Sequence, residues 1–147
     1  MSQVSIQGNA SGTGTFTIAA PNSNSNRTLT LPDADGTIAT AGATTTWTAP
    51  QRGTVTTDND LSFDMNVTNN FKCTPTATGA LTFTNITAGQ SGYVLLVNSG
   101  GYAITAAATT KVGATFLSTV SAAGTYLISY FSPDGTSVYC TASGALS

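Results

Sequence analysis

Apolar residues alternate with threonine along much of this chain, and this period of two constrains the fold more than any other feature. Phe16 and Ile18 fall on one side of an extended chain, with threonines on the other, and Leu29 and Leu31 repeat the pattern. Ile38 continues it more weakly. Successive side chains of a strand point to opposite faces, so this alternation is typical of half-buried strands.

The composition disfavours helix nearly everywhere. The 147 residues include 29 Thr and 15 Ser but no Glu, and only four are Lys or Arg. Long polar residues favour helices, whereas β-branched and aromatic residues favour strands. Only the short segment 106–110 has some helical character. We therefore predict an all-β protein.

The first part of the chain, residues 1–43, has the features of an N-terminal β-strand arm. It holds few large apolar residues, so its strands are not expected to fold alone. Their apolar faces need a partner, which can be the rest of the chain, sister subunits or another protein. A small, flexible linker follows over 40–46. The predicted interface with a sister subunit or another protein comprises Val4, Ile6, Phe16, Ile18, Leu29, Leu31, Ile38 and Trp47.

The second part, residues 44–147, is predicted to be a jelly-roll-like β-sandwich. Pro133-Asp134-Gly135 and Asn98-Ser99-Gly100-Gly101 read as tight turns. Short strands at intervals of about 8–12 residues are typical of sandwiches. The strands are expected near 53–57, 60–67, 70–74, 80–86, 92–98, 101–106, 114–120, 125–131 and 136–142.

The alternation also predicts the core. Leu127 and Ile128 are adjacent, so they cannot share a face of one strand. Cys73 and Cys140 are each in phase with an apolar neighbour, and we expect buried, reduced thiols, with a disulfide as the alternative. The remaining core candidates are Phe63, Phe71, Leu81, Phe83, Val94, Leu96, Phe116 and Tyr130.

Residue content argues against catalysis, and we predict no catalytic, cofactor or metal site. The chain has no His, which is the commonest general base and metal ligand. Asp58, Asp60 and Asp64 are spaced somewhat like a calcium loop, but no glycine occupies the required sixth position. On a strand they would share one face, so a solvated polar face is the simpler interpretation.

Nucleic-acid and membrane partners are not expected either. The four basic residues are scattered and the net charge is −2, whereas phosphate backbones require several basic contacts on one face. The N-terminal residues lack the basic and apolar regions of a signal peptide. The longest strongly apolar run, 93–97, is much shorter than the roughly 20 residues of a spanning helix.

Two stretches carry a resemblance. Gly12–Ala39, reading GTGTFTIAAPNSNSNRTLTLPDADGTIA, resembles a segment that recurs in structural proteins of tailed bacteriophages, many from cyanobacterial and marine phages. The stretches 86–92, 116–119 and 127–139 are similar to the β-rich ends of phage fibre and capsid-decoration proteins. The resemblance implies a virion component assembled in the host cytoplasm, commonly a homotrimer.

Three functions remain open at this point. A capsid cement or decoration protein would bind the major capsid protein and stabilise the head, and the short chain favours this role. A short tail or head fibre would adhere to host-surface glycans through exposed Tyr and Trp. A glycan-active enzyme would depend on one of the aspartates, and the residue content makes it the weakest of the three.

Overall fold

The structure is a computed structural model that describes residues 8, 10–15, 17–19, 22–28, 30 and 50–146. The chain divides into two units, Met1–Thr45 and Thr46–Ser147, which are described separately below. The expected boundary was between residues 43 and 44.

The described residues of the first unit lie in turns, bends and open chain, and none of them lies in a strand. The described hydrogen bonds here include a local one, from the Ser25 amide to Ser23 Oγ at 3.2 Å. A strand needs a second strand to satisfy its backbone groups. The strands predicted for this arm are thus not seen at its described residues. The other positions of the arm lie outside the described residues.

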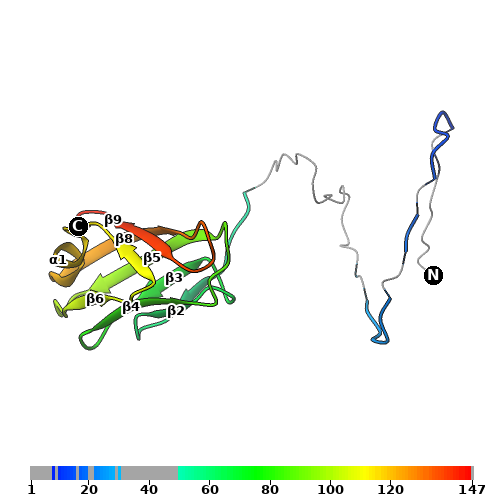
Figure 1. The fold of residues 1–147 in the computed structure, drawn as a ribbon. Coiled ribbons are helices and arrows are strands. Elements are labelled where there is room, and N and C mark those ends of the chain that lie inside the picture. Colours follow the sequence, from blue (N-terminus) through cyan, green and yellow to red (C-terminus); the bar gives the residue numbers. More distant parts are fainter. Residues whose placement is uncertain are drawn as a thin grey trace. The chain divides into compact units, whose positions relative to one another are not determined.

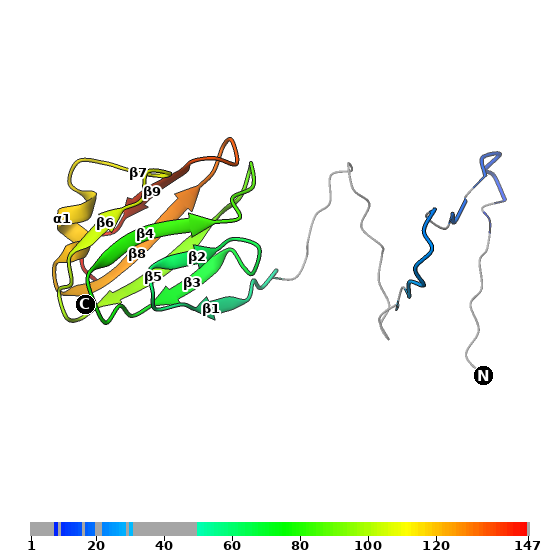
Figure 2. The same ribbon diagram turned by 60° about the horizontal axis from the view of Figure 1, so that its bottom comes forward.

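The second unit contains nine strands and one short helix within the described residues. Figure 1 and Figure 2 show them as two facing sheets, with α1 at one end. The elements are β1 (Val55–Thr57), β2 (Ser62–Asp64), β3 (Asn70–Cys73), β4 (Gly79–Thr84), β5 (Ser91–Asn98), β6 (Ile104–Ala106), β7 (Thr110–Val112), α1 (Phe116–Ser121), β8 (Gly124–Phe131) and β9 (Val138–Ala142).

From β1 to β6 the chain passes alternately between the two sheets. Strands β1, β3 and β5 enter a six-stranded sheet of order β1-β3-β5-β8-β9-β7, and β2, β4 and β6 form a three-stranded sheet in that order. Each return places a strand beside its predecessor in the same sheet and parallel to it. This part of the molecule is thus wound like a short two-sided coil.

The all-β class is confirmed, but the pairing differs from that of a jelly roll. Jelly rolls are antiparallel architectures, whereas five of the seven strand pairings described here are parallel. Antiparallel pairing between the named strands begins only after α1, where β8 pairs with β5 and then with β9. Alternation reveals which side chains face inward, but it carries no information about the direction of the neighbouring strand.

The core lies between the inner faces of the two sheets. The Phe63 ring is 5.0 Å from that of Phe71 and 5.5 Å from that of Phe83, measured between centroids. The Phe83 ring is also 4.8 Å from the Tyr130 ring, so aromatic contacts connect the two sheets. All predicted core residues except Leu127 are buried, as are both cysteines. Buried hydrophobic residues that were not predicted are Leu61, Met65, Ile104, Val120, Tyr126 and Val138.

One predicted strand, 114–120, is wrong because α1 occupies this segment. Phe116 and Val120 are four residues apart and both buried, which is the spacing of one helix face. The hydroxyls of Ser118 and Thr119 both donate to the Thr115 carbonyl at 2.9 Å. The helical character considered for 106–110 is also wrong, because that segment joins β6 to β7.

Candidate interaction surface

The outer face of the six-stranded sheet is the most distinctive surface of the second unit. Strand register aligns Val55, Asn70, Tyr93 and Ser129 in one row across β1, β3, β5 and β8. The neighbouring row, two residues along each strand, aligns Thr57, Lys72, Leu95 and Leu127. Residues between these rows, such as Phe71 and Val94, are buried in the core. Both rows therefore point away from the core.

Large apolar side chains are exposed on this outer face. The exposed fractions are 63% for Val55, 53% for Tyr93, 41% for Leu127, 48% for Phe131 and 53% for Tyr139. They come from β1, β5, β8 and β9, and Phe131 is the register partner of Tyr139. Single exposed apolar residues are ordinary, but several on one sheet face indicate an interaction surface.

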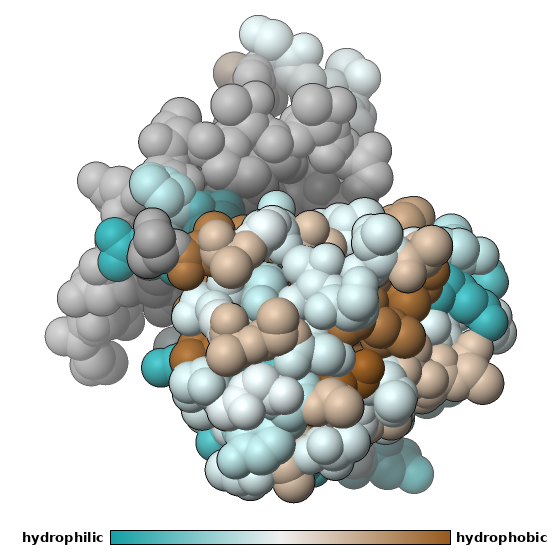
Figure 3. Space-filling model, turned by 90° about the vertical axis from the view of Figure 1, so that its left-hand side faces the viewer, coloured by the Kyte–Doolittle hydropathy of each residue, from teal (hydrophilic) through white to brown (hydrophobic). Residues whose placement is uncertain are grey.

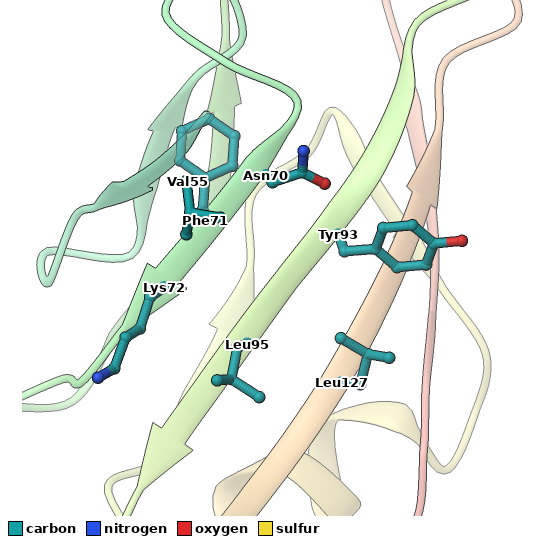
Figure 4. A pocket seen from close by; sticks show the side chains of 7 residues that line it. All are labelled: Val55, Asn70, Phe71, Lys72, Tyr93, Leu95 and Leu127. Atoms are coloured by element: carbon teal, nitrogen blue, oxygen red, sulfur yellow. The ribbon is translucent and has the colours of Figure 1, made fainter. Parts of the chain in front are cut away.

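One end of the outer face contains a groove of about 380 Å³. Figure 4 shows Leu95 between Lys72 and Leu127, with Tyr93 beside them. Within the described part of the chain, the Lys72 ammonium has no ion pair. The groove is thus mostly apolar, with the Lys72 ammonium at one side. It is lined by Val55, Asn70, Phe71, Lys72, Tyr93, Leu95 and Leu127.

The outer face of the three-stranded sheet has a different character. Its outward positions alternate with the buried Phe63, Leu81 and Phe83. These outward positions are small or polar, namely Ser62, Asp64, Ala80, Thr82, Thr84 and Thr105. On the end of the unit seen in Figure 3, pale residues of intermediate hydropathy dominate and strongly hydrophobic residues gather in patches. Of the two sheet faces, only that of the six-stranded sheet is rich in large apolar groups.

The aspartates serve local structure. Asp60 Oδ1 accepts a hydrogen bond from the Ser62 amide at 2.8 Å. Asp64 Oδ1 accepts from the Asn85 side chain at 2.8 Å and from the Asn66 amide, and both bonds hold the pKa of Asp64 below its usual value. The predicted polar face is seen only in part, because β2 begins at Ser62 and leaves Asp58 and Asp60 in the preceding loop.

The titratable core groups are held in their neutral forms. Burial raises the pKa of Cys73 to about 11 and that of Cys140 to about 12. Burial also raises the pKa of Tyr130 to about 12, and its hydroxyl donates to the Asn69 carbonyl at 2.9 Å. Thiols with such values are poor nucleophiles at neutral pH. No group of three or more His, Cys, Asp or Glu residues in the described ranges could hold a metal ion.

The interface predicted from the sequence can be examined at one residue. Ile18 is described and is 74% exposed, so it is available to a partner. The other residues of that prediction lie outside the described residues, and their role stays a prediction. They are Val4, Ile6, Phe16, Leu29, Leu31, Ile38 and Trp47.

Sequence reasoning missed the outer face, although a signal was present. The run 93–97, Tyr-Val-Leu-Leu-Val, is apolar at every position, so a strand there must present apolar residues on both faces. The adjacent pair Leu127 and Ile128 carries the same message, because only Ile128 enters the core. Such runs predict core strands, and the apolar residues on their second face predict a surface for a partner to cover.

No protein-family model, curated protein or solved structure matches this chain. None of the described helices is long and apolar enough to cross a membrane.

Proposed function

We propose that this chain is a structural component of a bacteriophage virion, assembled in the host cytoplasm. In this proposal it is a capsid cement or decoration protein that acts as a homotrimer, binds the major capsid protein and stabilises the head. Its role is binding and not catalysis. The observation that carries the proposal is the exposed apolar outer face, with Tyr93, Phe131 and Tyr139 about half exposed. Such a face gains free energy when a partner covers it.

The low charge of the chain supports the same proposal. Four basic and six acidic residues in 147 leave weak repulsion between neighbouring copies. Subunits arranged densely on a shell need this property. The mechanism is mass action, because a protein that binds only the assembled shell stabilises it relative to the opened one.

The test is the temperature at which heads rupture. Heads prepared without the protein should rupture at a lower temperature than complete heads, and adding the purified chain back should restore the difference. Equal rupture temperatures with and without the protein would refute the cement role.

A second candidate function is adhesion of a short tail or head fibre to host-surface glycans. The exposed rings of Tyr93, Phe131 and Tyr139 favour it, since aromatic faces can stack on sugar rings. Calorimetric titration with host-surface glycans distinguishes the two functions. A fibre should bind a glycan and leave the rupture temperature of heads unchanged, whereas a cement protein should do the opposite.

A further inference from the structure

We propose that the groove of one chain binds the side chains of Leu29, Leu31 and Asp33 of a second copy, in extended form. Leu29 and Leu31 would enter the apolar part of the groove, and Asp33 would pair with Lys72. This inference deepens the homotrimer part of the proposed function and rests on it.

The charge of the groove indicates the chemistry of its occupant. The groove is apolar except for Asn70 and Lys72, and Lys72 has no ion pair within the described residues. Two copies packed with these faces together would bring cations toward each other, because Lys72 and Lys111 lie in the register rows of this face and no acidic residue does. The occupant should therefore carry a carboxylate.

The carboxylates of the described second unit already have local contacts. Asp60 and Asp64 bond to nearby amides, and Asp134 accepts from Thr136 and Ser137 in its own turn. Asp58 lies beside Asp60, and burial, followed by that neighbouring carboxylate, raises the pKa of Asp58. The remaining side-chain carboxylates of the chain are at positions 33 and 35, directly after the alternating segment.

The segment also matches the groove in residue pattern and in length. In an extended chain Leu29, Leu31 and Asp33 point to the same side, and about 13 Å separates the first from the last. Leu127 and Lys72 lie on β8 and β3 with β5 between them, which is about 10 Å across the sheet, and the lysine side chain extends further. Two apolar groups followed by a carboxylate thus match two apolar positions followed by an ammonium group.

The described residues that flank the leucines are available to a second copy. Arg27, Thr28 and Thr30, which flank the leucines, are exposed and lie outside any strand. Passing this segment from each copy to the next gives a head-to-tail contact, which closes into a ring when the rotation permits. Extended segments of this kind commonly bind through alternate side chains.

The test begins with the solution mass of the full-length chain by light scattering. The wild-type chain should form a trimer at micromolar concentration. The double variant Leu29→Asp and Leu31→Asp should have the mass of one chain. The matched control, Thr28→Asp and Thr30→Asp, adds the same charge on the opposite side of an extended segment and should stay trimeric. A monomeric wild type, or a trimeric leucine variant, would overturn the inference.

Charge exchange tests the proposed ion pair. Lys72→Glu should weaken trimer association by about tenfold or more. Adding Asp33→Lys to the same chain should recover most of that loss. The pairing is wrong if the second change has no effect or weakens association further.

A mixing experiment asks whether the segment binds a second copy or its own chain. One variant keeps the groove but carries Leu29→Asp and Leu31→Asp; the other keeps the segment but carries Leu127→Asp. Each should be a single chain alone, and together they should form a pair. If the mixture remains single-chain, exchange between copies is refuted.

These outcomes are separable from those of the head-rupture test. If the leucine variant no longer forms trimers and the wild-type chain does not stabilise heads, the exchanged segment is supported and the cement role is refuted. If the wild-type chain stabilises heads and the leucine variant is still a trimer, the cement role is supported and the exchanged segment is refuted.

Discussion

At the scale of single residues, burial determines how stability depends on pH. The folded pKa values of Cys73, Cys140 and Tyr130 are raised to about 11, 12 and 12. The unfolded values are about 8.5 for Cys and 10 for Tyr. Between these limits the unfolded chain loses protons that the folded chain keeps, so stability falls as pH rises.

We therefore predict that the free energy of unfolding, measured in urea, is fully retained at neutral pH and declines steadily above about pH 8.5. A variant with Cys73→Ala and Cys140→Ala should begin its decline later, near pH 10, where tyrosine titrates. If the wild type and the variant show the same pH profile, the thiols are not the cause.

Core and outer-face residues should respond differently to truncation. Phe63 is 0% exposed and contacts two other rings, so Phe63→Ala should cost about 3–5 kcal/mol of stability. Leu127 is 41% exposed on the outer face, and Leu127→Ala should cost about 1 kcal/mol or less. Urea unfolding of the two variants, below the concentration at which chains associate, checks this contrast. Equal losses would mean that the two faces are misassigned.

At the scale of elements, the turn between β8 and β9 shows how much short motifs reveal. Pro133-Asp134-Gly135 predicted this turn, and the structure has it: Gly135 has φ +73°, a region that favours glycine. Asp134 Oδ1 accepts from the amides of Thr136 and Ser137, both at 2.8 Å, and these bonds lower the pKa of Asp134.

A lowered folded pKa contributes stability above the unfolded value of about 3.9, and this contribution is lost as pH falls through the folded value. Asp134→Ala should therefore lower the melting temperature at pH 7 relative to the wild type. At pH 2 the gap between the two proteins should be smaller. A gap that is unchanged by acid would show that the carboxylate charge does not support this turn.

Other elements show where sequence reasoning fails. Eight of the nine expected strands are present, because alternation and turn residues are local signals. The segment at α1 was misassigned because Phe116 and Val120 have helical spacing within a sequence rich in Thr and Ser, which gives little helix propensity. The parallel winding of β1–β6 depends on contacts between distant segments. Neither the alternation nor the turn residues carry information about such contacts.

At the scale of the whole molecule, the outer faces of the two sheets differ in polarity. The outer face of the three-stranded sheet is small or polar and can remain solvated, whereas the outer face of the six-stranded sheet presents apolar groups from four strands. The interface predicted from the sequence lies in residues 1–43 and at Trp47. The outer face adds a second such surface, one end of which holds the groove and the other Phe131 and Tyr139.

Co-sedimentation of the chain with phage heads prepared without it tests whether the outer face binds the capsid. The wild-type chain should sediment with the heads, and Phe131→Asp should remain in the supernatant, because the charge disrupts the apolar outer face. Thr84→Asp, on the polar face of β4, should bind like the wild type. The outer face is not the capsid-binding surface if the wild-type chain stays in the supernatant, or if Phe131→Asp binds as well as Thr84→Asp.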